Sequence, residues 1–275
     1  MTAQLLACGD DQIRLYEGAD NGMRETWRWT AQTAPGLPAV YRTTLLRKID
    51  DCKAVDGGKA ILATASTGAV VLVDRASGKV LFRARAPMAH SADLLPDGRI
   101  AVALSLHEAG NRLEIYSRTK NEKPLLHLDL YSGHGAVWDA QRQRLFTLSH
   151  DMIQAFRLED WATRKPRLIE TQRWQLPGKR DGHDLSLDPD THDFAVTTED
   201  GSWRFSPESG EYVAIPFLNP ARQVKAINFN GDSVAWVQAE DSWWSYGFTV
   251  AKRDGSARER INVTGIHLYK IRWFR

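Results

Sequence analysis

Short stretches of alternating apolar and polar residues run along the whole chain, separated by clusters of turn residues about every 8–12 positions. Ala60–Ala65, Ala69–Asp74 and Val80–Arg85 are typical stretches, and Ser66-Thr67-Gly68 and Ala76-Ser77-Gly78 are the turns between them. Side chains of a strand alternate between its two faces, so this period of two predicts strands rather than helices. The pattern therefore indicates an all-β protein, either a sandwich or a propeller.

A coarser repeat distinguishes these two architectures. Four short strands and then a return to the same pattern, about every 40–49 residues, is the signature of propeller blades. The sequence predicts a six-bladed β-propeller that occupies residues 1–275 as one domain, with four strands in each blade. The blades are expected to start near Ile49, His90, His134, His183, Gln223 and His267.

The sixth blade is predicted to combine the two ends of the chain. The strand after His267 is the last one in the sequence, whereas Gln4–Ala7, Gln12–Tyr16 and Thr26–Thr30 look like strands two to four of a blade that lacks its first. Pairing the last strand with Gln4–Ala7 would close the ring and leave no free sheet edge inside it.

Composition narrows the functional classes. Hydrophobic residues make up 43% of the 275 positions, charged residues 25%, and the net charge is +2. These values are typical of a globular domain and give no overall field that would recruit nucleic acid. The chain has no run of 18 apolar residues, so no membrane span is predicted. We expect a monomer that binds a small molecule or an oligosaccharide.

The only cysteines are Cys8 and Cys52. Two buried free thiols are the favoured interpretation, and a single Cys8–Cys52 bridge is the alternative if the protein is exported. The chain contains no signal-peptide pattern, but strand-like sequence begins already at Gln4. A trimmed leader is therefore expected, with a periplasmic or extracellular location, and a cytoplasmic location is the alternative.

Four of the eight histidines lie at the start of a predicted blade, each followed at positions two and four by an apolar or aromatic residue. Asp50 and Gln223 fill the two remaining blades when these are aligned on their turn glycines. In a propeller such residues form a ring around the central channel. The predicted ring is Asp50, His90, His134, His183, Gln223 and His267.

A ring of imidazoles has two chemically distinct uses. Neutral imidazole is a common ligand of transition metals, so His90, His134, His183 and His267 are candidate ligands of a divalent manganese, zinc or calcium ion. The alternative is a ring without metal, which either binds a polar ligand or ties neighbouring blades together through hydrogen bonds.

The loops predicted at the same channel mouth are rich in charge and tryptophan. Flat indole rings stack on sugar faces, and arginines pair with carboxylates through two hydrogen bonds. This mixture favours a carbohydrate ligand, and the arginines favour one that contains uronate. The candidate substrate contacts are Asp50, Gln223, Arg180, Arg222, Trp243, Trp244, His107 and His150.

The chain resembles a bacterial family of six-bladed propellers of unassigned function. The features that carry this resemblance are the six-blade pattern, Cys-Gly-Asp-Asp-Gln-Ile near the start, His-Ser-Ala-Asp-Leu-Leu-Pro-Asp-Gly from His90, and His-Leu-Tyr-Lys-Ile near the end. The resemblance covers the whole chain, implies no chemistry, and favours export. A more distant likeness, in style only, is to the metal-dependent oligogalacturonate lyases, which have seven blades. None of their catalytic residues can be carried over.

Three hypotheses follow. The first is a metal-assisted carbohydrate lyase or hydrolase, in which His134, His183 or Lys225 acts as the base. The second is a module that binds a sugar or metabolite without turnover. The third is an interaction platform that holds another protein. The sequence does not decide among these three hypotheses. It also leaves open whether the protein is an enzyme.

Overall fold

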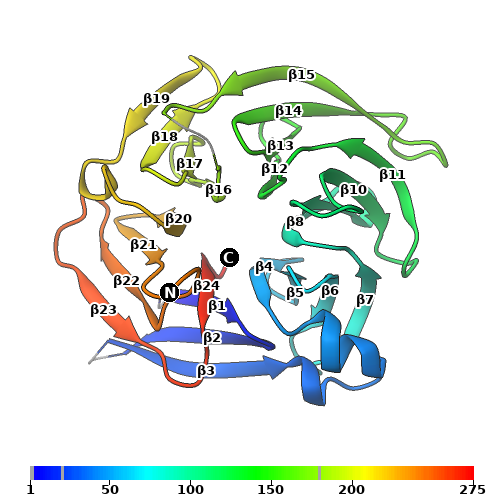
Figure 1. Cartoon of the computed structure of the whole chain (residues 1–275), viewed down its shortest axis with the longest axis horizontal. Coiled ribbons are helices and arrows are strands. Elements are labelled where there is room, and N and C mark those ends of the chain that lie inside the picture. The colour runs from blue at the N-terminus through cyan, green and yellow to red at the C-terminus, as the bar shows by residue number, and fades with distance from the viewer. Residues whose placement is uncertain (1–2, 20–21, 179–180) are drawn as a thin grey trace.

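A computed structural model describes residues 3–19, 22–178 and 181–275. These residues form six four-stranded antiparallel sheets that surround a central channel as the blades of a propeller (Figure 1). None of the helices in these ranges is long and apolar enough to cross a membrane. The predicted fold class is confirmed, including the shared blade at the chain ends.

The blades follow one another in sequence order, and each starts within one residue of its predicted position. The first three blades are β4–β7 (Ile49–Val55, Ala60–Ala65, Ala69–Asp74, Val80–Arg85), β8–β11 (Ala89–Leu95, Arg99–Leu104, Arg112–Ser117, Pro124–Asp129) and β12–β15 (Gly135–Asp139, Arg144–Leu148, Met152–Glu159, Arg167–Gln175). The next two are β16–β19 (Asp184–Leu187, Phe194–Thr197, Ser202–Ser206, Glu211–Ala214) and β20–β23 (Val224–Asn230, Ser233–Gln238, Gly247–Lys252, Glu259–Asn262).

The sixth blade consists of β24 (Leu268–Trp273) followed by β1 (Gln4–Gly9), β2 (Gln12–Ala19) and β3 (Gly22–Thr30). β24 pairs antiparallel with β1, with Leu6 opposite Arg272 and Cys8 opposite Lys270. Gly9 allows this pairing, because a Cβ atom there would lie 1.9 Å from the carbonyl oxygen of His267.

Short helical segments occur in the connections. Between the sixth and first blades lie η1 (Ala31–Thr33) and η2 (Tyr41–Leu45), and elsewhere lie η3 (Pro96–Gly98) and η4 (Pro216–Leu218). The η1–η2 connection is longer than the other links between blades, and it stands beside the channel mouth that carries the site described below.

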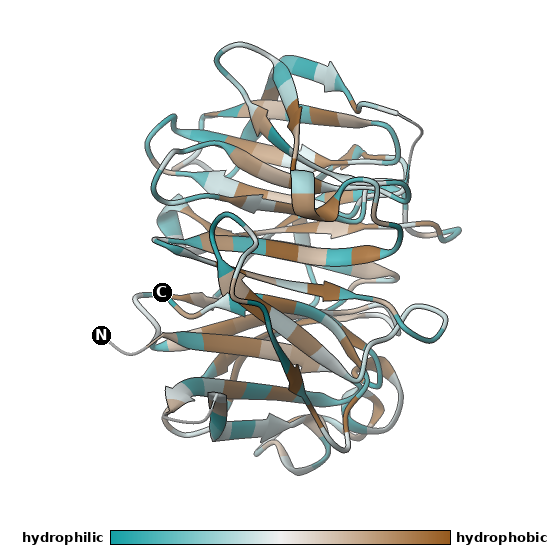
Figure 2. Cartoon of the chain, turned by 90° about the vertical axis from the view of Figure 1, so that its left-hand side faces the viewer, coloured by the Kyte–Doolittle hydropathy of each residue, from teal (hydrophilic) through white to brown (hydrophobic). Residues whose placement is uncertain are grey.

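The hydrophobic core is divided among the interfaces between neighbouring blades. Six clusters of buried residues each combine side chains of two adjacent blades. Seen from the side, brown hydrophobic segments lie along the strands and teal hydrophilic ones gather in the loops (Figure 2). A fully buried aliphatic side chain contributes about 1.5–3 kcal/mol, so each interface between blades is a substantial part of the stability.

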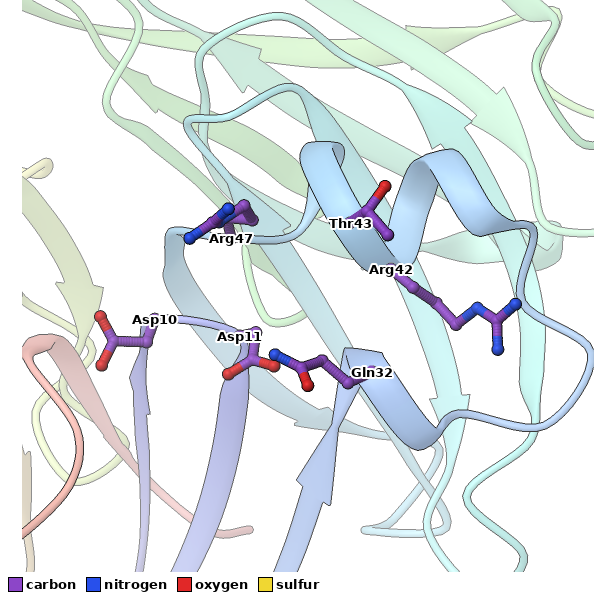
Figure 3. Close-up of a pocket in the computed structure, with 6 residues that line it drawn as sticks. All are labelled: Asp10, Asp11, Gln32, Arg42, Thr43 and Arg47. Atoms are coloured by element: carbon purple, nitrogen blue, oxygen red, sulfur yellow. The ribbon is translucent and has the colours of Figure 1, made fainter.

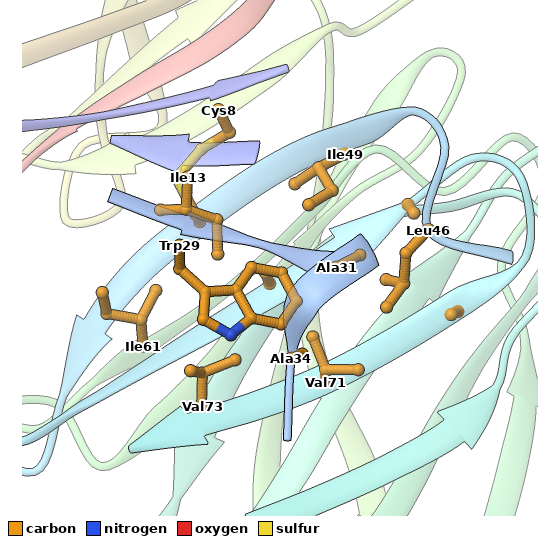
Figure 4. Packing of buried hydrophobic residues seen from close by; sticks show 14 of the residues in the cluster. Cys8, Ile13, Trp29, Ala31, Ala34, Leu46, Ile49, Ile61, Val71 and Val73 are labelled. Atoms are coloured by element: carbon orange, nitrogen blue, oxygen red, sulfur yellow. A yellow bond between two sulfur atoms is a disulfide. The ribbon is translucent and has the colours of Figure 1, made fainter. Parts of the chain in front are cut away.

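The interface between the sixth and first blades carries an additional covalent link. Cys8 of β1 and Cys52 of β4 are both fully buried and form a disulfide, with a Cα–Cα distance of 6.0 Å (Figure 4). The favoured interpretation of two free thiols is therefore wrong, because the two strands meet at the interface where the ring closes. Next to the disulfide, the indole of Trp29 donates a hydrogen bond across the interface to Gly78 O, at 3.0 Å.

We expect the double variant Cys8→Ala/Cys52→Ala to have a free energy of unfolding about 4 kcal/mol below that of the oxidised protein. The reason is that the disulfide closes a loop with a sequence separation of 44 and restricts the unfolded chain. Urea unfolding measures the difference. The reduced wild-type protein is the matched control, because it keeps both sulfur atoms. Equal stability of oxidised and reduced wild type would contradict the expectation.

Candidate functional site

The first strand of four blades carries one extra residue near its start. In β8, for example, Ala89 pairs with Leu104 and Ser91 with Ala103, so the residue between them has no partner on β9. Such β-bulges turn a side chain out of the regular alternation and are common beside active sites. The bulged residues are Asp50, His90, Lys225 and Tyr269.

The other two blades have a histidine at the equivalent point. His134 and His183 directly precede β12 and β16, and their backbone N–H groups donate to the carbonyl oxygens of Leu148 and Thr197, the residues that pair with the first residue of each strand. These six residues form the ring at the channel mouth.

The structure corrects two members of the predicted ring. The ring residue of the fifth blade is Lys225 instead of Gln223. The sequence alignment placed the ring residue a fixed number of positions before the turn glycine of each blade. The hairpin loop after β20 has two residues instead of three or four, so the same count ends two residues before Lys225. Tyr269 replaces His267, which precedes β24 and bonds the carboxylate of Asp10 at the surface, at 3.2 Å. Gln223 has a positive φ angle and lies two residues before the ring residue Lys225. Met88 and Ser132 also have positive φ angles and lie two residues before the ring histidines of their blades.

Side chains of the ring contact one another across the channel mouth. The His90 and His134 ring centres are 4.5 Å apart, those of His134 and His183 are 6.0 Å apart, and His90 also lies 6.0 Å from Tyr269. His90, His183, Lys225 and Tyr269 are buried, whereas His134 is partly exposed. Three of the four predicted histidines, His90, His134 and His183, thus lie in a row. The four histidines do not surround one common point.

Backbone carbonyls orient two of these histidines in the same way. Nδ1 of His90 lies 2.9 Å from Met88 O, and Nδ1 of His134 lies 2.9 Å from Ser132 O. The carbonyl can only accept, so Nδ1 carries the proton in both rings and Nε2 is left as an acceptor. Burial lowers the pKa of His90 to about 4 and that of His134 well below its ordinary value. Both imidazoles are therefore neutral at pH 7.

His183 has a different environment, because its Nε2 has two competing partners. Nζ of Lys225 and Oε2 of Glu199 both lie 3.1 Å from this nitrogen. Burial, followed by the charges of Lys225 and Lys270, lowers the pKa of His183 to about 3. Burial also lowers the pKa of Lys225 to about 8. A contact chain Glu199–His183–Lys225 therefore joins an acid, a neutral imidazole and an amine that loses its proton near pH 8.

A buried network of charges lies directly beneath the ring. Arg272 bonds both Asp51 and Asp184, and Nζ of Lys270 lies 3.1 Å from Oδ1 of Asp184. All four side chains are almost completely buried. Although burial alone would raise the pKa values of the two carboxyls, Arg272 and Lys270 hold them below the ordinary range. This network forms an ionic floor to the site.

Asp50 is the carboxyl of the ring itself. Its side chain accepts a hydrogen bond from the backbone N–H of Ser66. Burial nevertheless raises the pKa of Asp50 to about 8, so this carboxyl is mostly protonated at pH 7. At pH 7 the histidines and Asp50 are therefore mostly uncharged, and Lys225, with a pKa of about 8, carries the charge of the ring.

The predicted metal ligands do not converge. Within residues 3–19, 22–178 and 181–275, no group of three or more His, Cys, Asp and Glu side chains could hold a metal ion. Nε2 of His183 faces Lys225 and Glu199, and His267 lies outside the ring. A bound manganese, zinc or calcium ion remains a prediction.

The candidate substrate contacts lie at different places around the mouth. Trp243 covers Lys225, with Nζ 4.9 Å from its ring centre, and Trp244 packs on Tyr269 at 5.7 Å. The remaining residues lie outside this centre. Arg222 lies 3.6 Å from Glu199, His150 lies 2.6 Å from Asp181, the His107 ring caps its own turn at Ala109 N, and Arg180 is outside the described residues.

Two cavities adjoin the mouth on the side of the first and sixth blades. One, of about 510 Å³, is lined by Asp10, Arg47, Lys48, Thr67, Asp241, Trp244 and His267. The other, of about 700 Å³, is lined by Asp10, Asp11, Gln32, Arg42, Thr43 and Arg47 (Figure 3). They share Asp10 and Arg47, so they form one continuous depression, which we call the rim groove. Sequence reasoning had not selected Lys48, Thr67 or Tyr269, although Tyr269 follows His267 by two positions.

Residues 10–275 match the model of a family described as a family of unknown function, DUF6528. The chain belongs to this family. The predicted resemblance to propellers of unassigned function is thereby confirmed. A comparison with curated proteins found no match.

The depressed pKa values of the ring histidines of this DUF6528 member predict a pH-dependent stability. Unfolded histidines bind protons near pH 6.5, whereas His90 and His183 do so only near pH 3–4 when folded. Their contribution is thus complete above pH 6.5 and is lost as the pH falls toward 4. We expect each buried ring histidine to account for about 1–2 kcal/mol of the loss at pH 5.

Urea unfolding at pH 7 and pH 5 tests this dependence. His90→Gln should reduce the difference between the two pH values, because one shifted group is removed. His127→Gln is the matched control, since His127 is exposed on the outer strand β11. An unchanged difference in His90→Gln would contradict the assignment of His90 as a buried neutral imidazole.

Proposed function

We propose that the rim groove and the adjoining channel mouth bind an acidic carbohydrate, with uronate as the charged unit. The observation that carries this proposal is the combination of an aromatic face and uncompensated cations in one cavity. Trp244 lines the groove beside Lys48, whose Nζ lies 5.7 Å from the indole centre. An indole face packs on the apolar face of a sugar ring, and a lysine or arginine pairs with its carboxylate.

The lining of the groove holds three acids (Asp10, Asp11 and Asp241) and three cations (Arg42, Arg47 and Lys48), so the partners of these groups decide whether the groove favours an anionic ligand. The acids Asp10 and Asp241 have hydrogen-bond partners within the protein, since Asp10 bonds His267 at 3.2 Å and Asp241 accepts from the Tyr246 hydroxyl at 3.2 Å. Arg47 and Lys48, in contrast, have no carboxylate within 4.0 Å among the described residues. A ligand carboxylate would supply the missing partner for these two cations.

The distribution of exposed apolar side chains supports a ligand on this face. Trp243 is 54% exposed, and Tyr131 and Tyr246 are 59% and 45% exposed. All three lie in loops at the histidine mouth, as do the exposed Leu106 and Val40. The other large exposed apolar side chains of the described residues lie on outer strands. Exposed aromatic groups gathered around a polar centre are typical of sugar-binding sites.

Catalysis on such a ligand, by elimination or hydrolysis, is a second candidate. The contact chain Glu199–His183–Lys225 favours it, because a base that acts near neutral pH needs a pKa close to that pH. Product analysis after incubation with trigalacturonate tests this candidate: new double bonds support elimination, new reducing ends support hydrolysis, and unchanged trisaccharide opposes both.

The proposed location is the periplasm or the outside of the cell. The Cys8–Cys52 disulfide supports an oxidising compartment, since such bonds are rare in reducing ones. Acidic plant or microbial polysaccharides are encountered in those locations, which agrees with the proposed ligand class.

Titration calorimetry with trigalacturonate and with the neutral trigalactose tests the binding proposal. We expect Trp244→Ala to weaken binding of trigalacturonate about tenfold, equivalent to about 1.4 kcal/mol, through loss of the stacking face. Lys48→Ala should weaken binding of trigalacturonate but not of the neutral trisaccharide. The control Lys59→Ala changes an exposed lysine at the opposite end of the propeller and should have no effect. Equal affinities of all variants would overturn the proposal.

A further inference from the structure

Lys225 is a buried amine whose surroundings differ from those of the other buried lysines. Lys270 has Asp184 at 3.1 Å, and Lys53 has Asp93 at 3.9 Å. Lys225 is fully buried, yet among the described residues it has no carboxylate within 4.0 Å. Its amine instead lies 3.1 Å from a neutral imidazole nitrogen, that of His183. A buried lysine without an ion-pair partner is costly as a cation, and so the neutral, nucleophilic form is more accessible than in an exposed lysine.

We propose that Lys225 is a nucleophile that forms an imine with the carbonyl group of an aldehyde or ketone ligand at the channel mouth. The inference does not depend on the carbohydrate proposal, although the open-chain aldehyde of a reducing sugar is one member of this ligand class. A lysine activated by desolvation and by a neighbouring cation is a known arrangement for imine chemistry. Here the neighbouring cation is Lys270, whose charge lowers the pKa of Lys225 further.

The reaction balances with groups on this chain. The lone pair of neutral Lys225 Nζ attacks the carbonyl carbon. His183 Nε2 accepts one proton from the attacking nitrogen and passes it to the former carbonyl oxygen, which becomes a hydroxyl. The second proton of the nitrogen follows the same route to that hydroxyl, which leaves as water. A C=N bond then joins Lys225 to the ligand, with one water released and no oxidant or reductant required.

His183 becomes a stronger base when Lys225 is neutral. After burial, the positive charge of Lys225 is the largest cause of the lowered pKa of His183, and a neutral amine removes it. Oε2 of Glu199 lies 3.1 Å from the same nitrogen and stabilises a proton held there. Glu199 is itself fixed by the Gln223 amide, whose Nε2 lies 2.5 Å from Oε1. Gln223 is therefore a positioning residue behind the imidazole.

Trp243 controls access to the amine. Its ring lies over Lys225 at 4.9 Å while the residue itself is 54% exposed, so the indole separates Lys225 from solvent. It belongs to the loop between β21 and β22, which lies at the surface. Rotation of one exposed side chain would uncover Lys225, without any rearrangement of the strands.

Reductive trapping tests the proposal. The folded protein is incubated at pH 7 with glyoxylate, a small anionic aldehyde, and with cyanoborohydride, which reduces an imine to a stable secondary amine. Peptide mass spectrometry then gives the modified fraction of each lysine. We expect Lys225 to react about 100-fold faster than exposed Lys59, since a pKa of about 8 leaves far more neutral amine than the ordinary value of about 10.4.

Three variants sharpen the result. Lys225→Arg keeps the positive charge and should abolish labelling at this position, and a thermal melt establishes that it is folded. Trp243→Ala should increase the labelling rate of Lys225, because the covering indole is lost. His183→Gln should slow labelling while leaving that of Lys59 unchanged.

Labelling confined to exposed lysines, in both the wild type and Trp243→Ala, would overturn the inference. The calorimetric result with trigalacturonate is independent of this outcome. Labelling of Lys225 without oligosaccharide binding removes only the carbohydrate proposal, and binding without labelling removes only the nucleophile.

Discussion

The pairing of β24 with β1 is the constraint on which the rest of the molecule depends. It joins the two ends of the chain in one blade, and it brings into the channel the three side chains that β24 supplies. Tyr269 completes the ring at the mouth, and Lys270 and Arg272 form the cationic half of the ionic floor. Closure of the propeller and assembly of the site are therefore one event. The Cys8–Cys52 bond holds β1 against the first blade at the same interface.

The ionic floor also determines the chemistry above it. Arg272 pairs with both Asp51 and Asp184. Lys270 shares Asp184 with Arg272, so its positive charge is less fully compensated and acts on the groups at the mouth. That charge, added to burial, favours neutral histidines and lowers the pKa of Lys225. A network of this kind contributes little net stability compared with an apolar filling of the same volume. Its consequence here is a polar site whose histidines are unprotonated at neutral pH and whose amine has a pKa of about 8.

Periodicity in the sequence was sufficient for the fold, since each blade repeats the same four-strand pattern and its boundaries fall at recognisable turns. It was sufficient for only part of the ring. Asp50, His90, His134 and His183 were placed correctly, whereas the shorter hairpin at Gly231-Asp232 shifted the fifth blade by two residues. The last strand has no following hairpin from which to count, and so His267 was selected in place of Tyr269. The repeat predicted that the sixth and first blades meet, but it did not determine that the side chains of Cys8 and Cys52 face each other across that interface.

The distinction between the rim and the centre of the site follows from solvent exposure. At the rim, Arg47 and Lys48 are exposed to water, and an unpaired cation there costs little. At the centre, Lys225 is buried without a carboxylate partner, and burial lowers the pKa of its amine to about 8. One mouth therefore offers a ligand two kinds of nitrogen, cationic groups that attract an anion and a buried amine that can react. A molecule with a carboxylate at one end and a carbonyl at the other is chemically complementary to both.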